Sequence, residues 1–264
     1  MYVHNLDPVL IDLGFLAIRW YSLSYILGIV AGWWLGKKII SYRSNLLNID
    51  FNYKNFDDLI SWLIISIILG GRFGYIIFYN FNYYLINPID IFKIWEGGMS
   101  FHGALLGVIL ATYLFSSKIK LKPLFLLDII ACVAPIGLFF GRIANFINAE
   151  LYGKPAEVFW SVIFPKIDNL PRHPSQLYEA LLEGVVLFLI LIFLIFRKNY
   201  KTGFCAFYFL IFYGLFRIVA EQFREPDIHL GYLFGNISMG TYLSMVMILM
   251  GAFFLRKVIK NEFK

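Results

Sequence analysis

Several ionisable side chains lie inside long apolar runs of this sequence, where charged groups are costly and usually mark function. Arg217 and Glu221 are spaced i and i+4, so on a helix they share one face and are expected to form an ion pair. Arg142 and Asn145 are spaced i and i+3, which places a guanidinium and an amide on one helix face. Arg142 and Arg217 are expected at similar depth in the membrane, and helix packing alone does not require two guanidinium groups there. They predict a clamp for an anion, either a lipid phosphate or a carboxylate.

Other polar residues in the apolar runs are interpreted mainly as structural. Glu183 is expected to be the partner of an arginine, and Asp128 is expected to serve packing. Arg72 either pairs with a glutamate or touches a substrate, and the glycines of Gly70–Gly74 that flank it predict close packing of two helices.

The run Arg172–Ser175 is typical of a helix start, with Ser175 as the expected N-cap and Glu179 in the first turn, where the helix dipole favours a carboxylate. His173 is expected to make only local contacts in this turn. Tyr21, taken alone, is typical of an aromatic residue at a membrane interface.

These side chains must be positioned by membrane-spanning helices. The chain has 264 residues, of which 60% are hydrophobic and only 15% charged, and this composition excludes a soluble protein. Cys132 and Cys205 lie inside apolar runs, so neither a disulfide framework nor a zinc cluster is expected. The predicted fold class is all-α, a polytopic integral membrane protein.

Seven stretches are long and apolar enough to span a bilayer, which takes about 20 residues. They are Phe15–Leu35, Asp57–Tyr79, Phe101–Ser117, Leu124–Ile147, Gln176–Phe196, Gly203–Phe223 and Ile237–Leu255. An amphipathic segment between the second and third spans is predicted to lie in the membrane interface. The whole chain, residues 1–264, is expected to be one membrane-embedded domain with a small head on the outer face around residues 148–175.

The positions of lysine and arginine predict the orientation of these spans. Fourteen of these residues fall in segments on the C-terminal side, against five on the opposite side. The positive-inside rule then places the N-terminus outside and the C-terminus in the cytoplasm. Orientation and anionic lipids account for this positive charge, so no nucleic-acid partner is expected.

The run Gly141–Gly153, which reads GRIANFINAELYG, resembles the signature of bacterial prolipoprotein diacylglyceryl transferases. The similarity extends over nearly the whole chain. It includes Arg19–Tyr21, Gly70–Tyr75, Gly97–Gly103, Arg172–Glu179 and the segment from Tyr213 through Arg217 to Glu221. The sequence departs mildly from the family at Ala144, where a glycine is common, and in a shorter outer head after Gly153.

The resemblance implies a transferase of the bacterial cytoplasmic (inner) membrane with its active site toward the outer half. Such an enzyme moves the diacylglyceryl group of phosphatidylglycerol to the lipobox cysteine of a prolipoprotein, the first step of lipoprotein maturation. A thioether forms and glycerol phosphate is released. The expected partners are phosphatidylglycerol, the lipobox peptide and the lipid bilayer. No cofactor is expected. The sequence lacks the paired-aspartate motif with which magnesium-dependent lipid enzymes bind their metal, so no metal is expected either.

The same resemblance suggests roles for individual residues. Arg142 and Arg217 are expected to stabilise charge that develops on the phosphate, with Glu221 orienting Arg217. The phosphatidylglycerol-binding set is completed by Asn145, Glu150, Tyr213 and Gly153.

His102 is the preferred base for the incoming thiol, which attacks as thiolate, and Tyr21 is assigned to the catalytic set beside it. Arg72, His173 and Glu183 are expected to be structural or to support the residues that touch the substrate.

Two alternatives stay open from the residues alone. A membrane anion transporter could also gather arginines at one depth, but it predicts internal pseudo-symmetry and matching broken helices, and the sequence shows neither. A different lipid-modifying membrane enzyme could act on another acceptor.

Overall fold

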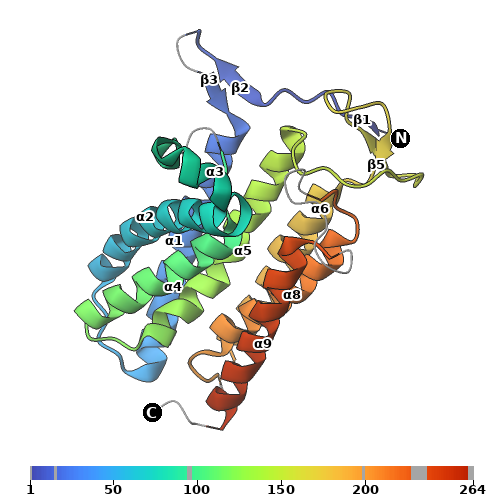
Figure 1. The fold of residues 1–264 in the computed structure, drawn as a ribbon. Helices are drawn as coiled ribbons and strands as arrows, with labels where there is room; N and C mark the ends of the chain where they lie inside the picture. The colour runs from blue at the N-terminus through green and yellow to red at the C-terminus, as the bar shows by residue number, and fades with distance from the viewer. Residues whose placement is uncertain (1, 15–16, 94–96, 198–199, 227–236, 261–264) are drawn as a thin grey trace. The chain divides into compact units, whose positions relative to one another are not determined.

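The computed structural model describes residues 2–14, 17–93, 97–197, 200–226 and 237–260. Seven helical segments of these residues are long and apolar enough to cross a membrane (Figure 1). This confirms the all-α polytopic membrane class. The spans are α1 (Trp20–Leu47), α2 (Tyr53–Tyr79), α4 (Phe101–Lys118), α5 (Pro123–Ile147), the continuous segment of α6 (Ser175–Glu179), η3 (Ala180–Val186) and α7 (Leu187–Ile195), then α8 (Phe204–Glu221) and α9 (Met239–Ile259).

The first span differs most from its predicted bounds, because it begins at Trp20 and continues to Leu47. At its beginning, β3 (Ala17–Arg19) pairs with β2 (Val9–Asp12) in a hairpin and so uses residues that hydropathy alone assigns to the helix. At its end, the helix runs on past two lysines whose ammonium groups lie over tryptophan rings of the same helix, Lys37 over Trp33 and Lys38 over Trp34.

The described chain divides into two compact units, each of which is considered by itself. One unit contains most of the spans, and the other contains α2 and α4. Of the described residues, the first unit comprises 2–14, 17–38, 128–197, 200–226 and 237–260, and the second comprises 39–93 and 97–127.

In the second unit, α2 and α4 pack through glycines spaced four residues apart on each helix. A Cβ atom added at Gly74 of α2 would lie 2.5 Å from the Cα atom of Gly103 of α4. One turn away, a Cβ atom at Gly70 would lie 3.1 Å from the Cα atom of Gly107. Small residues with this spacing let helix backbones approach closely in a membrane. The close packing predicted around Gly70–Gly74 is therefore confirmed.

The same unit contains two short helices between α2 and α4, which are α3 (Phe81–Ile86) and η1 (Pro88–Phe92). Large apolar side chains of this segment are exposed, among them Ile86, Ile89 and Phe92. The amphipathic character of this segment stays a prediction. Its location in the membrane interface stays a prediction.

In the first unit, α8 and α9 pack through Gly214 and Gly251, whose added Cβ atoms would each lie 2.9 Å from a backbone oxygen of the other helix. Asp128 of α5 caps the beginning of α8. Its carboxylate accepts hydrogen bonds from the amides of Gly203 at 2.5 Å and Ala206 at 2.9 Å. The structural role predicted for this buried aspartate is therefore confirmed.

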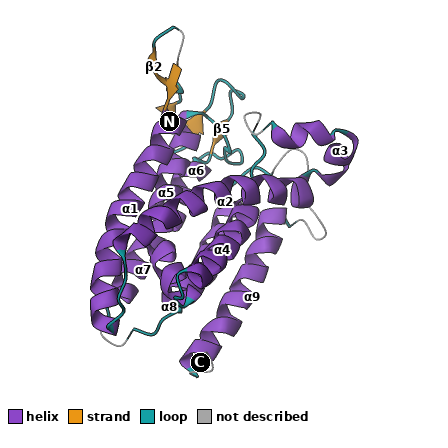
Figure 2. Cartoon of the chain, turned by 90° about the vertical axis from the view of Figure 1, so that its left-hand side faces the viewer, coloured by secondary structure: helices purple, strands orange, loops and turns teal. Residues whose placement is uncertain are grey.

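Two strands of a three-stranded sheet in the order β1, β4, β5 lie in the segment of residues 148–175, which we call the head after its predicted form. The N-terminal strand β1 (Tyr2–Val3) pairs parallel with β4 (Val162–Ile163), which pairs antiparallel with β5 (Pro171–Arg172). Ala149, Val162 of β4 and Phe164 form a small buried core here. Figure 2 shows strand β5 close to the end of the unit at which α6 begins.

Candidate active site

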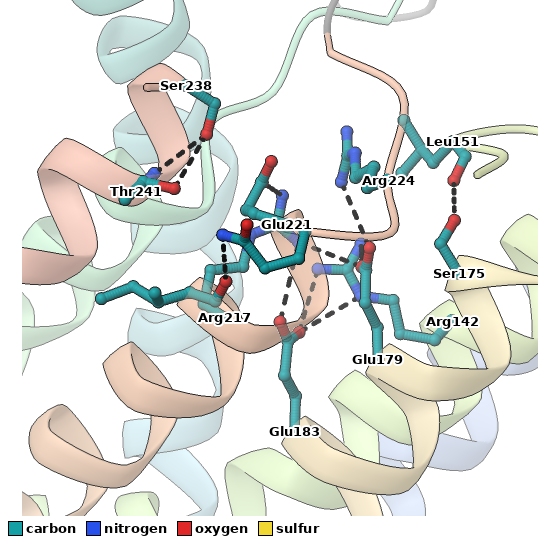
Figure 3. A network of polar contacts seen from close by, with 12 residues as sticks. Arg142, Leu151, Ser175, Glu179, Glu183, Arg217, Glu221, Arg224, Ser238 and Thr241 are labelled. Atoms are coloured by element: carbon teal, nitrogen blue, oxygen red, sulfur yellow. Dashed lines mark hydrogen bonds and ion pairs between the residues drawn. The ribbon is translucent and has the colours of Figure 1, made fainter. Parts of the chain in front are cut away.

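A buried cluster of arginines and glutamates joins three spans of the first unit (Figure 3). Arg142 of α5 places Nη1 2.8 Å from Oε2 of Glu179 and Nη2 3.0 Å from Oε2 of Glu183. Arg217 of α8 places Nη1 3.0 Å from the same Glu179 oxygen and pairs through Nη2 with Glu221. The ion pairs predicted for Glu183 with an arginine and for Arg217 with Glu221 are thus both present.

Glu179 is the centre of this arrangement. Its Oε2 atom accepts from both Arg142 and Arg217, and its Oε1 atom lies 3.6 Å from Nη1 of a third arginine, Arg224. Its side chain is 1% exposed. Burial of such a carboxylate is tolerated only with close compensation of its charge, and three guanidinium groups supply it. We refer to Arg142, Arg217, Arg224, Glu179, Glu183 and Glu221 as the arginine–glutamate cluster.

Local helix geometry brings the two central glutamates to the arginines. Glu179 ends α6, and Glu183 lies four residues later in η3, a π-helical stretch. Gly184 packs directly on Phe139, because an added Cβ atom would lie 2.7 Å from the Cβ atom of that residue. Phe139 precedes Arg142 by three residues, so this close approach of α5 also brings Arg142 within reach of Glu183.

The beginning of α9 completes the cluster on another side. Ser238 caps this helix by accepting a hydrogen bond from the amide of Thr241 at 3.2 Å (Figure 3). Gly240 leaves room for Glu221, since an added Cβ atom would lie 2.7 Å from Oε1 of that carboxylate. The Glu221 carboxylate therefore lies against the first turn of α9, where a helix favours negative charge.

Hydrogen bonds from α5 and α6 hold the signature segment that follows α5. Asn145 donates from Nδ2 to Oε2 of Glu150 at 3.2 Å, and Gln176 donates to the carbonyl of Glu150 at 2.6 Å. Ser175 is the first residue of α6, and its hydroxyl donates to the carbonyl of Leu151 at 2.9 Å. The predicted N-cap role of Ser175 is wrong, because this hydroxyl ties the signature segment to α6 and does not cap the helix.

Gly153 lies in a narrow gap between two other segments. Its amide donates to the carbonyl of His173 at 3.1 Å, and an added Cβ atom would lie 2.8 Å from the carbonyl oxygen of Phe223. It also forms an isolated β-bridge with Arg224 of the cluster. A side chain at this position would push apart the backbone segments that hold Arg224, which gives a structural reason for glycine here.

Arg172 fastens the same region from the head. Its guanidinium donates to Oδ2 of Asp168 at 2.5 Å, to the carbonyl of Gly153 at 2.9 Å and to Oε2 of Glu225 at 3.3 Å. The hydrogen bond from Arg172 lowers the pKa of the Asp168 carboxyl below its usual value. This arginine connects the head to the segment that follows α8.

His173 makes the expected local contact, but it also packs on a residue of a distant segment, so its contacts are not only local. Its Nδ1 atom lies 3.1 Å from the hydroxyl of Tyr178, and its ring packs edge-on against Phe223. Burial lowers the pKa of the His173 imidazole, so the neutral form is favoured.

In the second unit, Arg72 binds backbone and not a glutamate side chain in the contacts that the structure describes. Its guanidinium donates to five carbonyl groups, which belong to Asp90, Ile91, Lys93, Gly97 and Gly98. Gly97 and Gly98 both have positive φ angles, and at Gly98 an added Cβ atom would lie 2.9 Å from Nη1 of Arg72. Arg72 therefore shapes the segment that leads into α4.

His102 follows directly from that segment. It is the second residue of α4, and its side chain is buried, with the residue 8% exposed. Ser100 caps the helix by accepting from the amide of Gly103 at 3.3 Å, and its own amide donates to the carbonyl of Gly71 at 2.9 Å. The beginning of α4, and with it His102, is fixed against α2.

Two tyrosines of the predicted site lie in the first unit. Tyr21 is the second residue of α1, and its ring centroid is 5.1 Å from that of Tyr25. Tyr213 lies one helical turn before Arg217 on α8, and it is 1% exposed. Burial and spacing agree with the placement of Tyr213 on the stripe that carries Arg217.

The contacts of three residues are not predicted by the sequence. Glu179 is expected only in the first turn of its helix, although its i, i+4 spacing from Glu183 is a signal that both face one partner. Arg172 is expected only in the run that begins this helix, and Arg224 only as a loop charge. The distant partners of these arginines, Gly153 and Glu225 for Arg172 and Glu179 for Arg224, leave no local pattern in the sequence. Within the described residues, no group of three or more histidine, cysteine, aspartate or glutamate side chains could hold a metal ion.

Comparison with known proteins gives consistent matches over nearly the whole chain. A family model described as prolipoprotein diacylglyceryl transferase matches residues 8–256. The phosphatidylglycerol–prolipoprotein diacylglyceryl transferase of Rickettsia felis is 51% identical over 252 residues, which cover 94% of this chain and 95% of that protein. The protein of the same name from Rickettsia bellii is 50% identical over 260 residues, with 98% and 96% covered. The one from Rickettsia typhi is 49% identical over 255 residues, with 96% and 97% covered.

Proposed function

Because the chain belongs to the prolipoprotein diacylglyceryl transferase family, we propose that it transfers the diacylglyceryl group of phosphatidylglycerol to a prolipoprotein. The acceptor is the thiol of the lipobox cysteine. The bond between the glycerol carbon and the phosphate oxygen breaks, a carbon–sulfur bond forms, and glycerol phosphate leaves with the bonding electrons. This is the first step of lipoprotein maturation. The buried arginine–glutamate cluster is the observation that supports this chemistry.

The cluster suits an anionic leaving group. Phosphatidylglycerol carries a phosphodiester with one negative charge, and the departing phosphate monoester carries more. Groups that bind this extra charge stabilise the transition state more than the bound substrate. Arg142 and Arg217 are the proposed contacts for the phosphate. Planar guanidinium groups bind phosphate oxygens in pairs, which favours arginine over lysine here.

The three glutamates of the cluster hold these guanidinium groups before the lipid arrives. Arg142 is oriented by two carboxylates within 4 Å and Arg217 by three, with Glu179 and Glu183 common to both. Arginines that are already ordered lose little conformational entropy when the phosphate binds. Asn145, Glu150, Gly153 and Tyr213 are proposed to complete the site for the lipid headgroup.

The incoming thiol needs a base, since the thiolate is the nucleophile and a cysteine thiol has a pKa of about 8.5. His102 is the proposed base, and Tyr21 is proposed to assist in positioning. Arg72 supports His102 indirectly, by holding the segment that precedes α4.

The protein is a multi-pass membrane protein, and we place it in the bacterial cytoplasmic (inner) membrane. We propose that the N-terminus and the head around residues 148–175 face outward, so that the site opens toward the outer half of the bilayer. A lipobox cysteine that emerges from translocation would reach it from that side.

Reconstitution tests the proposal directly. The purified chain is placed in vesicles of phosphatidylglycerol with a lipobox peptide, and mass spectrometry searches for a diacylglyceryl adduct on the cysteine. We expect the adduct with phosphatidylglycerol and none in matched vesicles of phosphatidylethanolamine. Equal rates with both lipids would refute headgroup recognition by the cluster. Absence of an adduct from folded protein would refute the transfer itself.

A further inference from the structure

The span from Ser175 to Ile195 has two distinct faces. One face carries Glu179 and Glu183 into the buried cluster. The other carries a stripe of exposed apolar side chains, which are Leu181, Val185, Leu189 and Phe193, between 37% and 64% exposed. In a membrane-spanning helix, such a stripe faces the lipid chains. The rotation of this span in the bilayer is therefore fixed by its two faces.

At the N-terminal end of this span, exposed aromatic side chains of the head extend the apolar stripe. Tyr178 lies three residues before Leu181 on the same helical stripe, and its hydroxyl accepts a hydrogen bond from Nε1 of Trp160 at 2.7 Å. Trp160 belongs to the head and remains 49% exposed. Its neighbour Phe159 is 85% exposed, and the two rings meet edge to face with centroids 4.4 Å apart.

We propose that Phe159 and Trp160 form a membrane anchor that inserts into the headgroup region of the bilayer beside the beginning of α6. A tryptophan ring is favoured at this level, because its apolar body meets lipid while its N–H keeps a polar partner. Here the partner is Tyr178. The lipid surface is the fitting occupant, because the pair is continuous with the lipid-facing stripe of the span below it.

The anchor is coupled to the site through a short chain of contacts. Tyr178, which accepts from Trp160, also lies 3.1 Å from Nδ1 of His173. The backbone carbonyl of His173 in turn accepts from the amide of Gly153. A lipid-inserted Trp160 would thus hold the head, and the segment around Gly153, at a fixed depth relative to the bilayer surface.

Spin labelling of the full chain tests this anchor. Cys132 and Cys205 are fully buried, so a cysteine introduced by Phe159→Cys would be the site that a nitroxide reagent reaches. Asn169→Cys, at another exposed position of the same head, is the matched control. In vesicles of phosphatidylglycerol and phosphatidylethanolamine, we expect the label at 159 to collide several-fold more often with oxygen, and less often with a water-soluble nickel chelate, than the label at 169.

Two results would overturn the proposal. Nickel accessibility at 159 equal to that at 169 in vesicles would show that the aromatic pair lies in water. Protection of 159 that appears only after addition of a lipobox peptide would assign the surface to the peptide. Phe159 is nearly fully exposed, so its substitution is expected to leave folding intact, which a matching thermal unfolding curve would verify.

Discussion

Removal of the Arg142 side chain is expected to lower both stability and activity, and the two effects can be measured separately. Arg142→Ala leaves Glu183, which is fully buried, with its nearest remaining guanidinium atom at 3.6 Å, Nη1 of Arg217. Glu179 is less affected because Arg217 stays 3.0 Å away. Breaking a buried ion pair by deleting one partner costs about 3–5 kcal/mol in the free energy of unfolding. A double variant, Arg142→Ala with Glu183→Gln, removes the uncompensated charge and is expected to recover most of this loss.

Activity is expected to behave differently from stability. If Arg142 binds the phosphate, its loss removes stabilisation of developing charge, which is typically a factor of about 10²–10³ in kcat, or roughly 3–4 kcal/mol. Glu183→Gln supplies no guanidinium, so the double variant should be stable and still inactive. Thermal unfolding and the initial rate of adduct formation measure the two quantities on the same samples.

The same double variant can also refute the role proposed for Arg142. Activity restored together with stability would mean that Arg142 only compensates Glu183 and does not act on the phosphate. Unchanged stability of the single variant would mean that the cost assigned to an uncompensated Glu183 is wrong.

Three further changes test other parts of the structure. His102→Gln is expected to lower the rate of transfer and to remove the loss of rate at low pH, because protonation of a base abolishes its function. Gly103→Ala would place a Cβ atom 2.6 Å from the Cα atom of Gly74, and such overpacking is expected to cost about 1–3 kcal/mol of stability in thermal unfolding. Asp168→Asn removes a carboxylate whose pKa is lowered by Arg172, so wild type should unfold at higher temperature than the variant above about pH 4 and lose this advantage as the pH falls further.

Each of these has a control or an opposing outcome. An unchanged pH profile in His102→Gln would reassign the base. Gly137→Ala adds a Cβ atom that meets nothing within 4 Å, so it should not destabilise, and equal losses at Gly103 and Gly137 would refute the packing argument. A difference between wild type and Asp168→Asn that is independent of pH would show that the charge of Asp168 contributes nothing.

Much of the fold was predictable because hydropathy alone locates spans in a membrane. The seven spans and the glycine-mediated contact of α2 with α4 follow from local patterns. The bounds of α1 do not follow from such patterns. The hairpin before this helix and the lysines that lie over its tryptophans depend on interactions that a hydropathy window does not measure. The orientation in the membrane and the division into one domain with a head stay predictions.

The candidate site was predictable where partners share a helix and not where they come from distant segments. Spacing indicated the pair of Arg217 with Glu221, and depth indicated that Arg142 and Arg217 belong together. Glu179 is central because arginines of both α5 and α8 bind its carboxylate. Such a contact between three helices cannot be deduced from one local stretch of sequence. Arg72 shows the same limit, because backbone carbonyls that bind it leave no trace in side-chain chemistry.

The cap that Asp128 forms on α8 imposes an order on biosynthesis. The amides that it binds lie 75 and 78 residues further along the chain. At typical translation rates of about 5–20 residues per second, they are synthesised roughly 4–15 seconds after the aspartate. During this interval the nascent α5 carries a carboxylic acid with no helix end to bind. Retention near the edge of the bilayer would limit the free-energy cost of inserting this carboxylate. The contact of α5 with the beginning of α8 can therefore form only late in synthesis, after both spans have been made.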